Sequence, residues 1–224
     1  MKTYLELLDN NRRWAGTING VDPEYFSRHA AKQEPNFLFI GCCDSRVPTE
    51  LLTGARPGEI FTHRNIANQV HSNDLSVLSV LDYALHVLDV KHVIVCGHYN
   101  CGGVRAAIQK PSQSIVDNWL QGLRDIHMRH RLELDTFHDD DDRCRRLVEL
   151  NVLEQVYNLS RTPIVLHAWE KGRRPVLHGL VYDVNDGLLK ELVSNIDGEE
   201  HALELRGVVT SEFASVPSEL HMQE

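Results

Sequence analysis

The feature that most restricts the fold of this chain is the recurrence of short, unbroken apolar runs. Residues 37–41 read Phe-Leu-Phe-Ile-Gly, and residues 92–97 read His-Val-Ile-Val-Cys-Gly. Runs of this length without polar alternation are typical of strands buried on both faces, as in parallel sheets. Helical segments separate the runs, and parallel strands need such crossover connections. The pattern therefore predicts an α/β fold.

The same criteria give a full set of expected elements. Strands are predicted at residues 37–41, 59–62, 92–97 and 163–167, and a closing hairpin at 176–182 and 188–193. Helices are predicted at residues 48–52, 73–89, 104–108, 115–130 and 143–159. Two more helices are predicted at the N-terminus, the second with Asp22 as its N-cap. The helix at 73–89 is apolar nearly all round, so we expect it to be heavily buried.

Composition favours one globular domain. Of the 224 residues, 42% are apolar and 25% are charged, and no repeat or flexible linker divides the chain. We expect a mostly parallel central sheet with flanking helices and Rossmann-like crossovers. The expected division is an N-terminal helical arm at residues 1–34, an α/β core at 35–193 and a C-terminal extension at 194–224.

Charge and hydropathy argue against several classes of partner. Lys and Arg total 23 against 32 Asp and Glu, a net charge of −9 that disfavours nucleic acid and anionic membranes. No uncharged apolar run approaches the ~20 residues of a membrane span, and the N-terminus lacks the apolar core of a signal peptide. We therefore expect a cytoplasmic protein. Its five cysteines are then more easily explained as free, metal-bound or catalytic than as disulfides.

Potential metal ligands follow two of the predicted strands. Cys42 comes directly after the first strand, and His98 and Cys101 follow the strand at 92–97. If these strands are neighbours in a parallel sheet, both turns open at the same edge and the three side chains can converge. Two thiolates and one imidazole suit zinc, and three protein ligands leave the fourth position open, as in catalytic sites.

Asp44 and Arg46 extend this hypothesis. A carboxylate two residues beyond a ligand can accept a hydrogen bond from a zinc-bound hydroxide, or can itself be a conditional fourth ligand. Arg46 can hold Asp44 in a bidentate pair, which keeps the carboxylate ionised and off the metal. The simpler interpretation of a cysteine at a buried strand end is core packing, and we assign no function to Cys43, Cys96 and Cys144.

Three runs of the sequence resemble signatures of the β-class carbonic anhydrases. They are Cys42-x-Asp44-Ser45-Arg46, Phe61-x-His63-Arg64-Asn65-x-Ala67-Asn68 and Gly97-His98-x-x-Cys101-Gly102-Gly103. The resemblance extends over most of the chain, from about residue 10 to residue 189. It implies one zinc per subunit on Cys42, His98 and Cys101, with Asp44 and Arg46 as the catalytic pair. It also implies a dimer as the minimal active unit, often assembled into a tetramer.

The resemblance further implies a substrate pocket and a regulatory site. The cleft would lie at the dimer interface and be lined by Gln33, Phe61, Ile66, Tyr83 and Gly102. Some members have a bicarbonate regulatory site made of a tryptophan, a glycine and a tyrosine, at positions matching Phe39, Gly41 and Tyr182. Phenylalanine lacks the indole donor, so one hydrogen bond to the anion would be missing here.

The resulting hypothesis is reversible hydration of CO2 to bicarbonate and a proton, with zinc-bound hydroxide as nucleophile. Two thiolates formally cancel the metal's charge, so the pKa of the bound water should exceed the ~7 of three-histidine sites, and activity should rise into alkaline pH. Two alternatives remain open at this point. One is a hydrolase of carbon disulfide or a similar linear molecule on the same scaffold, and the other is a zinc-stabilised redox or binding module.

Overall fold

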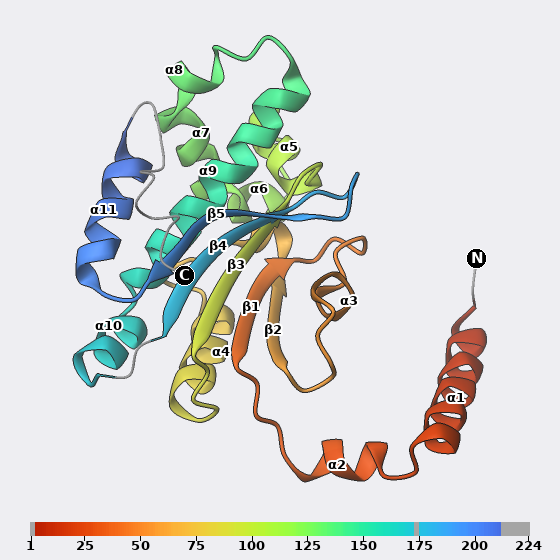
Figure 1. Ribbon diagram of the computed structural model, residues 1–224. Coiled ribbons are helices and arrows are strands. Elements are labelled where there is room, and N and C mark those ends of the chain that lie inside the picture. Colours follow the sequence, from red (N-terminus) through yellow and green to blue (C-terminus); the bar gives the residue numbers. More distant parts are fainter. Residues whose placement is uncertain (1–2, 173–174, 212–224) are drawn as a thin grey trace.

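The computed structural model describes residues 3–172 and 175–211 of the chain. Five strands form one sheet in the order β2-β1-β3-β4-β5, which runs through the centre of the molecule (Figure 1). The first four strands are parallel to their neighbours, and β5 is antiparallel to β4. The predicted mostly parallel α/β fold is therefore confirmed. The strands are β1 (Phe37–Cys42), β2 (Ile60–Asn65), β3 (His92–His98), β4 (Val176–Tyr182) and β5 (Leu189–Ile196).

Helices connect the strands and pack around the sheet (Figure 1). Those before β3 are α1 (Tyr4–Val21), α2 (Tyr25–Ala31), α3 (Thr49–Thr53), the 3-10 helix η1 (Ile66–Asn68) and α4 (Leu75–His86). Those between β3 and β4 are α5 (Gly102–Ile108), α6 (Ile115–Trp119), α7 (Gln121–Arg129), α8 (Arg131–Leu134), α9 (Asp140–Ser160) and α10 (Pro163–Glu170). Helix α11 (Glu199–Thr210) follows β5. Within the described ranges, none of these helices has the length and apolar character needed to cross a membrane.

The long helix α9 packs closely on β3 and β4, and two glycines make this possible. A Cβ atom at Gly97 would lie 2.7 Å from Cγ2 of Val152, and a Cβ atom at Gly179 would lie 3.0 Å from Cγ1 of the same valine. Any larger residue at these positions would push the helix away from the sheet. The close contact fixes the end of β3, where His98 directly follows Gly97.

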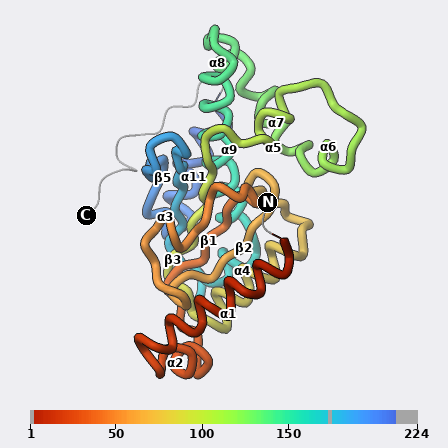
Figure 2. The backbone as a smooth tube through the Cα atoms, turned by 90° about the vertical axis from the view of Figure 1, so that its right-hand side faces the viewer, coloured from red at the N-terminus to blue at the C-terminus, as the bar shows by residue number. Residues whose placement is uncertain are grey.

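The N-terminal arm, formed by α1 and α2, extends away from the sheet (Figures 1 and 2). No residue of α1 is buried, although several of its side chains are apolar. Tyr4, Leu5 and Val21 are 72%, 69% and 84% exposed. The rings of Trp14 and Phe26 meet edge to face, with centroids 5.6 Å apart, and join the two helices. The arm thus presents an apolar surface that the rest of the described chain does not cover.

The prediction of a strand at residues 163–167 is wrong, because this run begins helix α10. Thr162 is the N-cap, and its hydroxyl accepts a hydrogen bond from the backbone N–H of Val165 at 3.3 Å. Pro163 lies in the first turn, where a missing N–H costs nothing. A short apolar run looks the same in a buried strand and a buried helix, so the capping threonine was the distinguishing signal.

Three helix predictions also need correction. The expected helix at 115–130 is interrupted at Leu120, which divides it into α6 and α7. Asp22 does not cap the second helix, because it ends α1 and α2 begins at Tyr25. Helix α4 is buried on one face only, since Leu75 is 79% and Tyr83 is 43% exposed. The sequence reading also missed α11, which lies inside the region expected as a C-terminal extension.

Candidate metal centre

Three potential metal ligands converge at the carboxyl edge of the sheet. Cys42 ends β1, His98 ends β3, and Cys101 directly precedes α5. Because β1 and β3 are parallel neighbours, both strand ends lie at the same edge. One ligand atom from each of the three side chains lies within 4.8 Å of the other two. The three residues are 6%, 0% and 3% exposed, so the predicted set forms a buried cluster.

The geometry of this cluster fits a tetrahedral zinc ion. The two sulfur atoms are 3.9 Å apart, and two thiolates bound tetrahedrally at about 2.3 Å lie roughly 3.8 Å from each other. Nδ1 of His98 is 2.9 Å from the carbonyl oxygen of Tyr99, to which it donates. Nε2 of His98 is buried and has no hydrogen-bond partner among the residues that the structure describes. An N–H at Nδ1 leaves a lone pair at Nε2, which is the form a metal requires.

The two cysteines are electrostatically coupled. The hydrogen bond from Cys101 is the main cause that lowers the pKa of Cys42, to about 4, and burial opposes this shift. The same interaction, together with burial, raises the pKa of Cys101 far above that of a free thiol. One thiolate and one thiol therefore face each other before a metal binds. A dipositive ion would replace the shared proton, so metal binding should release it.

Asp44 and Arg46 form the predicted bidentate pair beside the cluster. Nε of Arg46 is 3.0 Å from Oδ1 of Asp44, and Nη2 is 2.8 Å from Oδ2. The Arg46 guanidinium is the main cause that holds the pKa of Asp44 well below its usual range. Oδ2 of Asp44 also lies 3.7 Å from Nε2 of His98. The carboxylate is thus ionised, oriented and close to the unpartnered nitrogen.

Arg64 supports the loop that carries these residues, a role that sequence reasoning did not assign. Its guanidinium donates to the carbonyl oxygens of Cys42 and Asp44, at 2.9 and 2.7 Å. Arg46 also donates to the carbonyl oxygen of Asn100, at 3.2 Å, and so ties this loop to the one after β3. In the sequence, only the position of Arg64 within residues 61–68, one of the three runs that resemble β-class carbonic anhydrase signatures, pointed to this residue.

Tyr99 anchors the loop that follows His98. Its hydroxyl donates to Glu149 at 2.6 Å, and the Arg145 guanidinium lies over its ring, 3.6 Å from the centroid. Its backbone N–H donates to the carbonyl oxygen of Tyr182 at 3.0 Å. Burial, followed by the Glu149 carboxylate, raises the pKa of Tyr99 well above its usual value. The side chain is therefore a neutral donor in a fixed position.

One chain brings only part of the expected substrate pocket to the metal cluster. Ile66 packs on the first turn of α5, since a Cβ at Gly103 would lie 3.0 Å from its Cγ2, and Gly102 is the first residue of that helix. Phe61 lies four residues, about 13 Å, before the register partner of Cys42 on β2.

Tyr83 and Gln33, the other two expected pocket residues, also lie away from the metal cluster. The ring of Tyr83 on α4 lies 5.9 Å from that of Phe61, centroid to centroid. Gln33 precedes the opposite, amino end of β1 and is exposed. A single chain therefore does not assemble Gln33, Phe61 and Tyr83 around the metal cluster.

The three positions of the expected regulatory site lie on one face of the sheet. Phe39 and Gly41 are two residues apart on β1, and the strand register puts Tyr182 of β4 on the same face. Phe39 is buried, and its ring packs against Gly41, where a Cβ would lie 2.7 Å from Cε1. The phenyl ring of Phe39 thus fills the space beside Gly41, and it offers no hydrogen-bond donor to an anion there.

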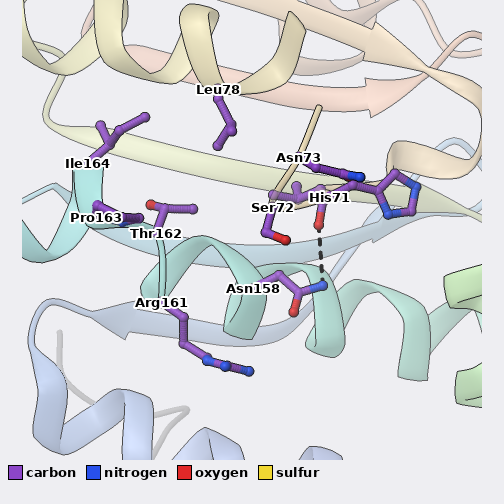
Figure 3. A pocket seen from close by; sticks show the side chains of 10 residues that line it. His71, Ser72, Asn73, Leu78, Asn158, Arg161, Thr162, Pro163 and Ile164 are labelled. Atoms are coloured by element: carbon purple, nitrogen blue, oxygen red, sulfur yellow. Dashed lines mark hydrogen bonds between the residues drawn. The ribbon is translucent and has the colours of Figure 1, made fainter. Parts of the chain in front are cut away.

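A cavity of about 600 Å³ lies away from the metal cluster, between the N-terminus of α4 and the junction of α9 and α10 (Figure 3). Its lining includes His71, Asn73, Asn158, Arg161 and Thr162. None of the cluster's three ligands contributes to it. The chemistry of the side chains, rather than the size of the hollow, identifies the candidate centre.

Together, these features define a class of protein: an α/β metalloenzyme whose Cys-His-Cys centre lies at the carboxyl edge of a parallel sheet, next to an ionised carboxylate. A sequence model described as carbonic anhydrase matches residues 37–189. The chain belongs to the β-carbonic anhydrase family.

Individual relatives cover most of the chain. A carbonic anhydrase of Emericella nidulans is 47% identical over 196 residues, which are 88% of this chain and 85% of that protein. The β-carbonic anhydrase of Coccomyxa, solved with acetazolamide, is 39% identical with a TM-score of 0.85, covering 90% of this chain and 91% of the other. A tetrameric enzyme of Sordaria macrospora is 37% identical with a TM-score of 0.81, covering 84% and 96%.

Proposed function

We propose that this chain is a zinc-dependent enzyme that interconverts CO2 and bicarbonate, with one Zn²⁺ per subunit on Cys42, His98 and Cys101. The observation that carries the proposal is the buried Nε2 of His98, which has no hydrogen-bond partner in the described parts of the chain and lies beside two cysteine sulfurs 3.9 Å apart. A buried nitrogen without a partner is unfavourable, and a bound cation would satisfy it. Membership of the β-carbonic anhydrase family supports the same assignment.

When bound, zinc supplies the Lewis acidity that turns water into a hydroxide nucleophile near neutral pH. The chain's own residues then orient the reaction. Asp44, held ionised by Arg46, can only accept hydrogen bonds, so it fixes the direction in which the nucleophile's proton points. Ile66, which is 39% exposed and packs against Gly103, supplies apolar surface two residues beyond Cys101, where a neutral linear molecule such as CO2 can lie.

Stopped-flow measurement of CO2 hydration by protein of verified zinc content tests this proposal. Because two thiolates reduce the effective charge of the metal, we expect kcat/KM to rise from pH 6 to pH 9. A profile that is flat over this range would contradict the ligand set. Zinc-loaded protein that hydrolyses carbon disulfide but does not hydrate CO2 would move the assignment to the alternative hydrolase.

We also propose that the active form is at least a dimer. Gln33, Phe61 and Tyr83 lie far from the cluster of their own chain, so a second copy must supply them if they line the pocket. The exposed apolar side chains of α1 provide a surface for that copy. The tetrameric Sordaria macrospora relative supports self-association, without deciding between two and four subunits.

Replacing two apolar residues of the arm tests this association. Leu5→Glu with Leu8→Glu puts two charges on one face of α1, three residues apart, and we expect at least tenfold weaker self-association with a parallel loss of activity. Light scattering after size exclusion should report at least twice the 25.5 kDa chain mass for the wild type. Leu132→Glu on α8, which is 51% exposed, is the matched control and should keep the wild-type mass. A monomeric, fully active wild type would refute the proposal.

A cytoplasmic location is part of the proposal. Zinc binding needs both cysteines as thiolates, and a reducing compartment preserves them. The five cysteines are all free in the structure.

A further inference from the structure

The turn after β2 has an unfavourable backbone conformation. Ala67 has φ 60° and ψ 30°, and Asn68 has φ 48°, so both adopt the left-handed conformation although neither is glycine. In this region the Cβ atom crowds the backbone, and two such residues in succession are disfavoured. Both residues are buried, at 0% and 1% exposure. The surrounding structure must therefore impose this conformation.

The strained turn touches both segments that carry the metal ligands. Ala67 lies two residues beyond Asn65, the register partner of Cys42 in the sheet. A Cβ at Gly103, two residues beyond Cys101, would lie 3.1 Å from the Cβ of Ala67. The backbone N–H of Ala67 is also among the groups that lower the pKa of Cys42. A change in this turn would thus be felt at Cys42 and at the start of α5, which directly follows Cys101.

Three side-chain amides of α9 face the turn. Asn151, Gln155 and Asn158 are spaced four and three residues apart, which places them on one side of the helix. We call these three residues the amide stripe. Asn151 and Gln155 are 1% and 2% exposed, in a helix whose other buried positions are mostly apolar. Buried amides at such positions are costly unless every polar atom is paired.

Asn151 is the centre of the stripe. Its Nδ2 donates to the carbonyl oxygen of Ala67 at 3.0 Å, and its Oδ1 accepts from Nε2 of Gln69 at 2.7 Å and from Nε2 of Gln155 at 3.0 Å. Nε2 of Gln69 donates to the same Ala67 carbonyl at 2.7 Å. Two donors therefore hold the peptide oxygen of the strained residue in place.

Gln155 and Asn158 hold the far end of the turn at Val70. Oε1 of Gln155 accepts from the backbone N–H of Val70 at 2.8 Å. Nδ2 of Asn158 donates to the carbonyl oxygen of Val70 at 3.3 Å, the bond drawn at the wall of the cavity in Figure 3. The stripe thus binds the backbone on both sides of Asn68, and the turn cannot relax without breaking buried hydrogen bonds.

We propose that the amide stripe positions the metal site: it holds Ala67 and Asn68 in the left-handed conformation and so keeps Ala67 packed beside Cys42 and against the start of α5, which directly follows Cys101. Asn151 is then a positioning residue that acts on Cys42 through Ala67. The inference rests on the proposed function, because it concerns the same metal centre. It goes beyond that function by assigning a role to residues of α9 that contact neither metal ligand nor substrate.

The Asn151→Leu variant tests this proposal in the full-length protein loaded with Co²⁺ in place of zinc. Leucine has a similar size but removes every hydrogen bond of the amide. A thiolate that loses a neighbouring N–H donates more strongly to the metal, so we expect the thiolate-to-cobalt absorption band to move to longer wavelength. Zinc affinity, measured by competition with a chelator, should fall about 10- to 100-fold, as for other residues that orient metal ligands.

Val156→Ala is the matched control on the same helix. The side chain of Val156 packs towards Gly179 of β4, and its truncation leaves a small core cavity without touching the turn. The control should keep the wild-type band and zinc affinity, although it lowers stability. Folded Asn151→Leu protein with the same band and affinity as the wild type would overturn the proposal. Wild-type protein without a thiolate band would instead refute the metal centre itself.

Two further variants keep the proposal testable if Asn151→Leu does not fold. Asn158→Leu changes the half-buried end of the stripe, and we expect a smaller band shift with about tenfold weaker zinc binding; no change in either would overturn the proposal. Ala67→Gly combined with Asn151→Leu removes the left-handed strain at residue 67, because glycine adopts φ of 60° freely. This double variant should recover folding and part of the zinc affinity, and no recovery would argue against positioning through the strained turn.

Discussion

The Cys42→Ser variant should lose its zinc and its CO2 hydration together. A serine hydroxyl stays protonated at neutral pH, so the centre would lose one of two thiolates and Nε2 of His98 would face a neutral group. We expect less than about one tenth of a zinc ion per chain by elemental analysis. Hydration should fall to the buffer background, on the order of a thousandfold or more, because the metal provides the nucleophile.

Cys43→Ser is the matched control, since it makes the same atomic change one residue away. Cys43 is exposed and lies outside the Cys-His-Cys cluster. We expect this variant to bind one zinc per chain and to retain wild-type hydration. If Cys42→Ser protein bound zinc fully and hydrated CO2 at the wild-type rate, the assigned ligand set would be wrong. If Cys43→Ser also lost its zinc, the effect would lie in the loop rather than in the ligand.

The fold could be predicted where local pattern and tertiary environment agree. Residues 37–41 and 93–97 are apolar because β1 and β3 lie inside the sheet, and the structure places the two strands side by side, as the convergence of the metal ligands required. Residues 163–167 are equally apolar yet helical, because Thr162 caps the run and Pro163 fits a first helical turn. Apolar content alone carries no information about which of the two conformations the backbone adopts.

The candidate site could be predicted to the extent that its residues are close in sequence. Asp44 and Arg46 are two residues apart, and His98 and Cys101 three, so the turn after each strand brings them together. Arg64 and the amide stripe reach the site from other elements, and only the folded arrangement reveals such long-range contacts. In our proposal the expected pocket residues Gln33, Phe61 and Tyr83 come from a second copy, and the sequence pattern of one chain does not describe how two copies meet.

The Arg46→Ala variant should keep its zinc but lose about 99% of its activity. The guanidinium holds both oxygens of Asp44, and without it the carboxylate is free to turn towards the metal. Oδ2 already lies only 3.7 Å from Nε2 of His98, so Asp44 can occupy the fourth coordination position that water needs. Stopped-flow hydration and elemental analysis of the same sample should show a roughly 100-fold fall in kcat/KM at one zinc per chain.

Arg131→Ala on α8 is the control, since it removes a guanidinium from an exposed ion pair with Asp135 and should change neither zinc content nor rate.

The pH dependence of the Arg46→Ala variant identifies the cause of its loss of activity. Arg46 lowers the pKa of Asp44, so removing Arg46 moves that pKa up towards the ordinary value of an aspartate, still far below neutral. Asp44 therefore remains ionised from pH 6 to pH 9 in both proteins, but hydroxide competes better with a metal-bound carboxylate as the pH rises, so the activity deficit of the variant should shrink towards pH 9. A deficit that stays constant from pH 6 to pH 9 would show that Asp44 does not compete with water for the metal in the variant, and would contradict this account of Arg46.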